Sequence, residues 1–288
     1  MRTELPLRGC GLVAELDRTN LVDGRLRLWW LGQSGFLLQC DGIRLLIDPY
    51  LSDSLATKYA GTSTPHERMT ERPVEPSQLS NIHCVCVTHH HTDHADPWTL
   101  DPLLQNNPWA ALILPAASQA YITGRLATRP NRLIAMDAED SFAGAGFSVL
   151  AIPAAHENIE LDEAGRCRYL GYLIRLGSCH IFHSGDTVWD EQVLKAVSPH
   201  EIDLALLPIN GRGKGVAGNL DAAEAAEMAR RIGAGWTIPC HYGMFAFNSG
   251  SVEDFRCHAE KLALQFATPV CGTLWAYPEA PPAATPKL

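Results

Sequence analysis

The chain has 288 residues, a formal net charge of −9 and 46% hydrophobic residues. This hydrophobic content is enough for a large core and excludes a chain that is disordered throughout. Because the net charge is negative and no block of Lys and Arg occurs, we expect no nucleic-acid partner. No apolar stretch approaches the length of a membrane span, so we expect no membrane association.

Cysteine use and the polar start predict where the protein works. Nine cysteines, an odd number, are spread along the chain, and the first six residues are too polar for a secretory leader. We therefore expect a reduced, cytoplasmic protein. No linker divides the sequence, which predicts a single domain over 1–288, with related halves at about 1–155 and 165–277 and a disordered tail at 278–288.

The first half of the chain begins with apolar runs that predict strands at 26–31, 35–40 and 43–47. The polar segment 52–80 has little periodicity and predicts a long loop. A β-branched run predicts a buried strand at 82–88, and Asp96 and Pro97 then predict the start of a helix that runs to about 105. Further strands are expected at 111–114 and 133–136, a helix at 118–127 and a hairpin through 147–152.

The second half also predicts strands that alternate with helices. It predicts strands at 169–176, 180–183, 204–207 and 237–238, and helices at 190–197, 221–232 and 251–266. Asp221 and Glu224 fit a capping box at the start of the middle helix. Strand-rich runs followed by alternating strands and helices, twice over, favour two mixed sheets face to face with helices outside.

Residues 89–94 read His-His-His-Thr-Asp-His, which is a typical divalent-metal motif. On an extended chain His89 and His91 point to the same side and can bind one ion together. Asp93 and His94 lie in the turn before the helix and can face a second ion. His90 is expected to point away from its neighbours.

Three further residues are candidates for the remaining ligands because each follows a predicted strand: His156, Asp186 and His241. Taken singly, each fits an ordinary structural side chain. Taken with the motif, which cannot fill two ions alone, they become the best candidates.

The order of these ligands resembles the metallo-β-lactamase superfamily of binuclear hydrolases over nearly the whole chain. Segments 29–35, 183–187 and 238–241 resemble more closely the branch that includes bacterial L-ascorbate 6-phosphate lactonase. The resemblance implies an α/β fold, a four-layer αββα sandwich, with the site at one edge. It implies that one ion is held by His89, His91 and His156, and the other by Asp93, His94 and His241.

In the same resemblance Asp186 bridges the two ions and Asp48 orients a ligand histidine, although Asp48 also fits a plain turn residue before Pro49. Zinc, manganese and iron all suit these ligands. A metal-bridged hydroxide is expected to attack a small, anionic lactone or ester resembling a sugar-acid lactone phosphate, with Asp93 accepting the proton of the water.

Candidate substrate contacts come from a Gly-rich basic loop, from the long loop and from the residue after His241. They are Asn210, Arg212, Lys214, His66, Arg68 and Tyr242, each of which also fits an ordinary loop residue. Two alternatives stay open: a phosphodiesterase or nuclease of the same superfamily, and a metal-binding protein without catalysis. We expect a small-molecule substrate, and the sequence is compatible with a homo-oligomer.

Overall fold

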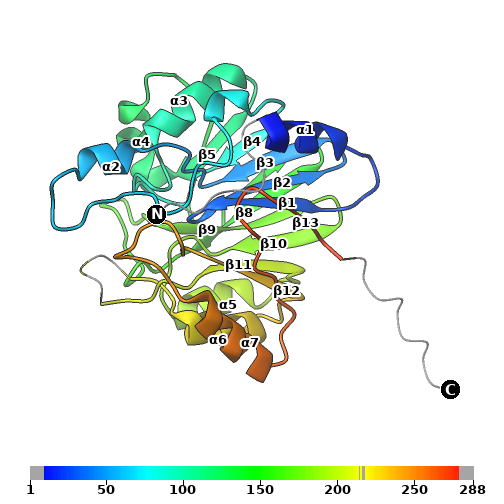
Figure 1. Ribbon diagram of the computed structural model, residues 1–288, viewed down its shortest axis with the longest axis vertical. Coiled ribbons are helices and arrows are strands. Elements are labelled where there is room, and N and C mark those ends of the chain that lie inside the picture. Colours follow the sequence, from blue (N-terminus) through cyan, green and yellow to red (C-terminus); the bar gives the residue numbers. More distant parts are fainter. Residues whose placement is uncertain (1–9, 214, 216–217, 279–288) are drawn as a thin grey trace.

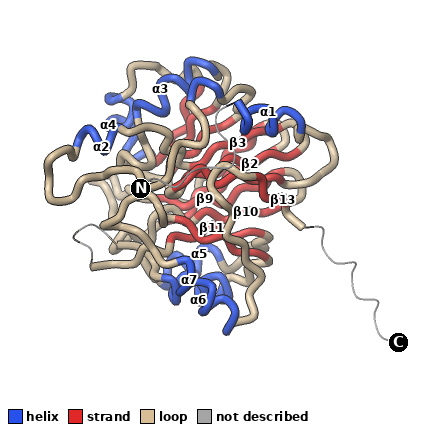
Figure 2. The backbone as a smooth tube through the Cα atoms, in the orientation of Figure 1, coloured by secondary structure: helices blue, strands red, loops and turns tan. Residues whose placement is uncertain are grey.

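The computed structural model describes residues 10–213, 215 and 218–278. Two β-sheets lie face to face between two layers of helices (Figure 1). Figure 2 shows the strands at the centre, with helices above and below them. This arrangement confirms the expected four-layer α/β fold. Lys214 and residues 279–288 of the expected tail lie outside the described residues.

The first sheet has seven strands in the order β13-β1-β2-β3-β4-β5-β6. Their bounds are Leu274–Ala276 (β13), Arg27–Gly32 (β1), Gly35–Cys40 (β2), Ile43–Ile47 (β3), Cys84–Cys86 (β4), Ala111–Pro115 (β5) and Arg132–Met136 (β6). The strands from β3 to β6 are parallel. Their carboxyl ends therefore meet at one edge of the sheet.

The second sheet has six strands in the order β12-β11-β10-β9-β8-β7. Their bounds are Trp236–Cys240 (β12), Leu204–Pro208 (β11), Cys179–His183 (β10), Leu170–Leu176 (β9), Phe147–Pro153 (β8) and Ser141–Gly144 (β7). β10, β11 and β12 are parallel, and β9 is antiparallel to both β8 and β10. Strands β8, β10 and β12 therefore end at the same edge.

Helices cover the outer face of each sheet. On the first sheet they are α1 (Cys10–Arg18), α3 (Pro97–Asn106) and α4 (Gln119–Arg125), and on the second α5 (Glu191–Val197), α6 (Ala222–Arg231) and α7 (Val252–Lys261). The short helix α2 (Ser54–Lys58) lies to one side, where Leu55 packs with Tyr50, Met244 and Phe245. Two short 3-10 helices, η1 (Pro76–Gln78) and η2 (Ala116–Ser118), complete the set. The predicted start of α3 is confirmed by the Asp96 carboxylate, which accepts the Trp98 amide, and the capping box of α6 is confirmed as well.

Alternation along the strands builds the separate hydrophobic layers. In β1, Leu28 and Trp30 lie between the two sheets, whereas Trp29 and Leu31 face the helices of the first layer. Residues of both sheets form the central cluster, and a third cluster joins the second sheet to α5, α6 and α7. The single-domain organisation and the relation between the halves stay predictions.

Several predicted bounds were wrong. The segment 52–80 is not a plain loop, because it contains α2 and η1, and α1 and β13 were not predicted at all. The last helix ends at Lys261 rather than 266, since Ala263 has a φ of 53° and Phe266 then forms a β-bridge with Thr237. Only Cys84–Cys86 of the predicted strand 82–88 forms a ladder.

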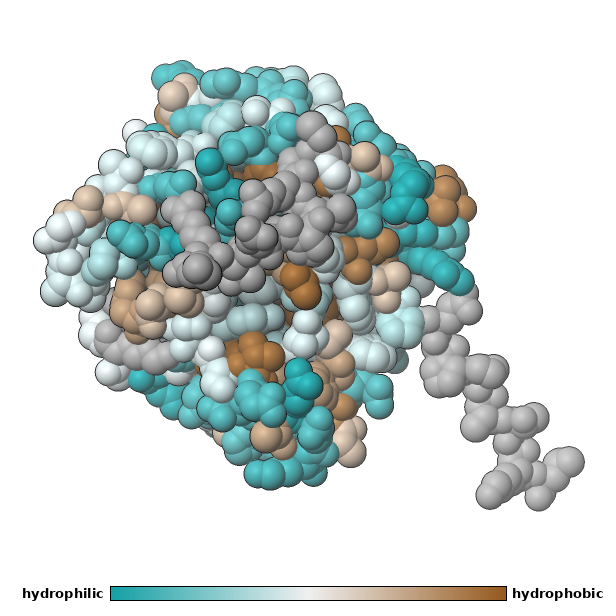
Figure 3. All heavy atoms as spheres, viewed as in Figure 1, coloured by the Kyte–Doolittle hydropathy of each residue, from teal (hydrophilic) through white to brown (hydrophobic). Residues whose placement is uncertain are grey.

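The surface carries polar and apolar side chains intermixed. On the face in Figure 3, hydrophobic side chains gather in separate patches among polar ones. None of the helices within the described residues combines the length and the apolar character needed to cross a membrane.

Candidate metal centre

The loop 89–94 places four of the candidate ligands between β4 and α3. A tight turn closes it, because the amides of His94 and Ala95 both donate to the His91 carbonyl, at 3.0 and 2.7 Å. The helix start then fixes the end of the loop: Asp96 accepts hydrogen bonds from Thr99 Oγ1 at 2.6 Å and from Ser54 Oγ at 2.8 Å. The local sequence thus holds the loop in one conformation.

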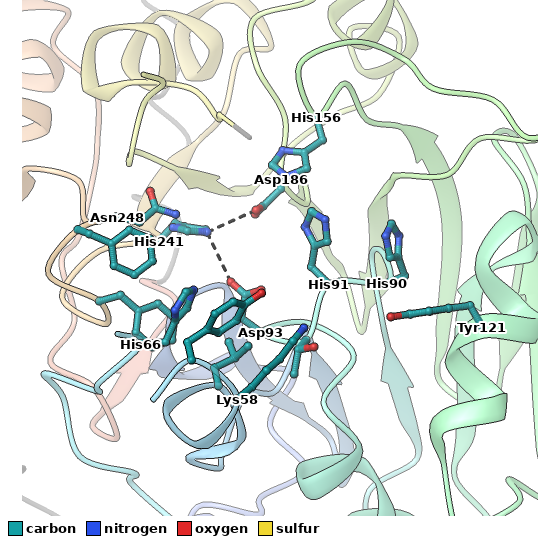
Figure 4. Close-up of a pocket in the computed structure, with 15 residues that line it drawn as sticks. Lys58, His66, His90, His91, Asp93, Tyr121, His156, Asp186, His241 and Asn248 are labelled. Atoms are coloured by element: carbon teal, nitrogen blue, oxygen red, sulfur yellow. Dashed lines mark ion pairs between the residues drawn. The ribbon is translucent and has the colours of Figure 1, made fainter. Parts of the chain in front are cut away.

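The other three candidates come from the second sheet. His156 follows β8, Asp186 follows β10 and His241 follows β12, and these strands end at the same edge. Figure 4 shows His156, Asp186 and His241 directed towards His91 and Asp93 from across the cavity. The edge where the two sheets meet therefore gathers side chains that are far apart in sequence.

The ligand atoms lie close enough for shared ions. Three groups each have ligand atoms within 4.8 Å of one another: His89, His91 and His156; His89, His94 and Asp186; and Asp93, His94 and His241. Asp186 Oδ2 is 3.4 Å from both His94 Nε2 and His241 Nε2. Two atoms that each lie about 2.1 Å from one ion can be up to about 4.2 Å apart, so these separations suit divalent cations.

Three histidines each have Nδ1 held by a neighbouring group of the protein. Asp48 Oδ2 lies 2.7 Å from His94 Nδ1, Thr88 Oγ1 lies 3.0 Å from His89 Nδ1, and the Gly218 carbonyl lies 3.0 Å from His156 Nδ1. Nε2 of His94 is buried without a hydrogen-bond partner in the described chain. Such outer contacts are typical of metal-binding histidines, and the unpartnered nitrogen fits an ion.

Asp48 itself is held firmly in place. It is fully buried with a φ of 42°, and its carboxylate accepts the Thr88 amide at 2.8 Å and the Thr88 hydroxyl at 2.6 Å. The contact with His94 is therefore made by a fixed group, which orients the ring of His94.

The electrostatics of the site favour a positive charge. Burial lowers the pKa of His89 well below its usual value and lowers that of His91 to about 4, so both rings are neutral, as metal ligands must be. For His94, burial acts in the same direction, but Asp186, Asp48 and Asp93 outweigh it and raise the pKa well above the usual value. Three carboxylates thus surround one buried imidazole, Asp48 at Nδ1 and Asp93 and Asp186 at Nε2, and they attract either a proton or a cation.

Both carboxylates of the centre are ionised at neutral pH. Burial raises the pKa of Asp186, but His94 and His241 outweigh it and hold the pKa well below the usual range. The same balance lowers the pKa of Asp93. Asp93 retains 19% of its side-chain exposure, against 4% for Asp186, so it reaches further into the cavity.

A cavity of about 350 Å³ opens above this centre. Figure 4 shows His66 and Asn248 on one side of it and His90 and Tyr121 on the other. Residues that the sequence did not single out complete the lining: Leu55, Lys58, Tyr59, Thr92, Phe245 and Phe247. Their segments are far apart in sequence, and no local motif could have predicted that they meet.

The predicted substrate residues fall into two groups. His66 lines the cavity and stacks on Tyr59, with ring centroids 4.1 Å apart. Arg68, in contrast, is buried and donates to the backbone carbonyls of Tyr50 and Thr70, at 2.9 and 3.2 Å. The structure therefore brings His66 to the centre and uses Arg68 to hold the segment 50–70 together.

The remaining candidates lie away from the cavity lining. Arg212 forms an ion pair with Glu224, Asn210 hydrogen bonds to Asn248 at 2.9 Å, and Tyr242 stacks on Trp30 at 4.4 Å. None of these three is among the described residues that line the cavity. A cation that does line the cavity is Lys58, from α2.

Comparison with known protein families shows which superfamily the chain belongs to. The model of the β-lactamase superfamily domain matches residues 43–242. The chain belongs to this superfamily. A UPF0173 metal-dependent hydrolase of Aeropyrum pernix is 27% identical over 83% of this chain and 91% of its own, and one of Rubrobacter xylanophilus is 28% identical over 84% and 92%. A probable L-ascorbate-6-phosphate lactonase of Salmonella choleraesuis is 22% identical over 87% of this chain and 79% of its own.

Solved structures share the fold at lower identity. A metallo hydrolase from Ignicoccus hospitalis has a TM-score of 0.67 and 18% identity, over 89% of this chain and all of its own. An isothiocyanate hydrolase from Delia radicum gut bacteria has a TM-score of 0.69 and 17% identity, over 87% and 98%. The superfamily member described here is thus a metal-dependent hydrolase with the metallo-β-lactamase fold.

Proposed function

We propose that this superfamily member hydrolyses a small ester- or lactone-type substrate at a binuclear centre. His89, His91 and His156 would hold one ion, Asp93, His94 and His241 the other, and Asp186 would lie between them. The observation that carries the proposal is the convergence of these side chains, from both sheets, at the floor of one cavity. Mixed nitrogen and oxygen ligands suit zinc, manganese or iron.

The proposed chemistry divides between the ions and the chain. Two divalent ions, when bound, would supply Lewis acidity, which would lower the pKa of water towards neutrality and polarise the oxygen of the electrophile. Asp93 is ionised and is the more exposed carboxylate, which supports it as the group that would accept the proton of the attacking water. Asp48 holds His94 in one ring orientation while this happens.

The cavity lining supports a substrate with an apolar or aromatic body and one anionic group. Tyr59, Phe245 and Phe247 form an aromatic wall with His66, whose ring centroid is 5.1 Å from that of Phe245 and 4.6 Å from that of Phe247. Lys58 is the cation in the lining and can face a carboxylate or phosphate. The lactonase relative supports a cyclic ester, and a cavity of about 350 Å³ suits a small molecule.

The test is a substrate panel on protein of known metal content. Elemental analysis is followed by assays of lactones, thioesters, carboxylate esters, isothiocyanates and phosphodiesters after the bound metal has been restored. We expect turnover of an ester or lactone and its loss in His91→Ala. The matched control is His180→Ala, at the opposite end of β10 from Asp186. Full activity in His91→Ala, or turnover of phosphodiesters alone, would contradict the proposal.

A further inference from the structure

Gln33 lies under the metal centre although it belongs to no predicted ligand group. It sits in the turn between β1 and β2, with a φ of 51°, and is fully buried. Its backbone carbonyl accepts the Trp30 indole N–H at 2.9 Å and the His241 amide at 3.0 Å. The turn is thereby tied to β1 and to the loop that carries His241, so the side chain starts from a fixed point.

The carboxamide of Gln33 contacts two of the candidate ligands directly. Its Nε2 is 2.9 Å from Asp93 Oδ2 and 3.1 Å from His241 Nε2. Its Oε1 is buried and has no hydrogen-bond partner among the described residues. An unpartnered buried amide oxygen is costly and calls for an explanation.

The contact with His241 cannot survive the binding of an ion. A neutral imidazole nitrogen has one lone pair, which can accept the Gln33 N–H or bind a cation, but not both. When His241 Nε2 coordinates, the Gln33 amide must lose this partner. Rotation about the soft terminal torsion of Gln exchanges its nitrogen and oxygen and replaces the hydrogen bond from Nε2 to Asp93. Oε1 then lies beside Asp93 Oδ2 and His241 Nε2, where a cation would pair with it.

From these contacts we propose that Gln33 is an additional ligand of the ion held by Asp93, His94 and His241, through Oε1. The proposal rests on the proposed binuclear centre. It adds to the difference that Asp93 already makes between the two positions. His89, His91 and His156 offer only nitrogen, whereas the other position has carboxylate and amide oxygens together with its histidines. Oxygen ligands favour harder cations, so manganese is favoured at the Gln33 position relative to zinc.

The direct test is a crystal structure of the zinc-loaded full-length protein. We expect Gln33 Oε1 at about 2.0–2.2 Å from the ion between Asp93 and His241. An amide that still donates from Nε2 to Asp93, with Oε1 beyond ligand distance, would overturn the proposal. This measurement needs no variant and does not depend on activity.

Binding isotherms for Mn²⁺ provide a second test. We expect Gln33→Leu to weaken the binding of one equivalent of Mn²⁺ by about tenfold or more and to leave the other equivalent unchanged. Gln33→Glu, which keeps an oxygen at the same place, should bind Mn²⁺ at least as tightly as the wild type. The matched control is Gln39→Leu: Gln39 is also buried, but it bonds to Arg44 and to the Thr19 carbonyl.

The outcomes separate this inference from the proposed function. Wild-type protein that binds two equivalents, with Gln33→Leu indistinguishable from it, refutes the role of Gln33 and leaves the binuclear centre standing. Wild-type protein that does not bind two equivalents refutes the binuclear centre itself. Weakened binding in Gln33→Leu but not in Gln39→Leu supports the proposal.

Discussion

Asp48→Asn is the sharpest test of how the protein tunes its metal site. Asparagine tolerates the φ of 42° at this position, and its Oδ1 can still accept the Thr88 amide. Its NH₂ group, however, replaces the oxygen that lies 2.7 Å from His94 Nδ1. A donor there favours the tautomer with its hydrogen on Nε2, which is the nitrogen that faces the ion. Metal binding then requires the hydrogen to move from Nε2 to Nδ1 of His94, where it would face the NH₂ group of the asparagine.

The expected loss of metal affinity is about 10- to 100-fold, the usual effect of removing an outer partner of a metal-binding histidine. This corresponds to about 1.4–2.8 kcal/mol of binding free energy. Competition with a chromophoric chelator measures it. Asp203→Asn is the control. Asp203 also accepts a hydrogen bond from a backbone amide, that of His180, at 2.7 Å, and it lies 3.4 Å from the His180 imidazole. It lies at the end of β10 opposite to Asp186. Equal affinity in Asp48→Asn and wild type would refute the reasoning.

Two further predictions concern the ions and the cavity. Removal of metal by a chelator should lower the unfolding temperature, because an ion at a hundred times its Kd stabilises the fold by about 2.7 kcal/mol. Calorimetry should show a smaller shift in His91→Ala, which lacks a ligand of one of the two ions. Lys58→Gln should raise KM for an anionic substrate by up to about fivefold with kcat little changed, as expected for an exposed charge pair. Lys58→Arg should keep the wild-type KM, and an equal rise in KM for a neutral analogue would show that Lys58 does not act through charge.

Local sequence was sufficient to predict that the candidate ligands converge, because their placement depends on short-range geometry. The motif 89–94 sits in a turn between a strand and a capped helix, and both were predicted from neighbouring residues. The positions of His156, Asp186 and His241 followed from a single rule, that parallel strands end at one edge. Such predictions require the direction of each strand but no knowledge of side-chain packing.

The cavity lining could not be predicted in the same way. Tyr59 and His66 come from a polar segment without periodicity, and they meet Phe245 and Phe247 only in the folded protein. The sequence predicted that Arg212 binds an anion of the substrate. In the structure, however, Glu224 both completes the capping box of α6 and forms an ion pair with Arg212. Which cationic side chain is available to bind a substrate therefore depends on ion pairs formed in the folded protein, and the composition of the sequence does not indicate these pairs.

The division of ligands between the sheets links the metal centre to the packing of the fold. The loop after β4 belongs to the first sheet, whereas His156, Asp186 and His241 belong to the second. Ions bound between them would cross-link the two sheets at one edge, and the central hydrophobic cluster joins the sheets behind it. Gln33 adds a further link, since its turn in the first sheet is bonded to His241 in the second. A change that shifts one sheet against the other would therefore alter the separations of the candidate ligands, so we expect core packing and metal affinity to be coupled.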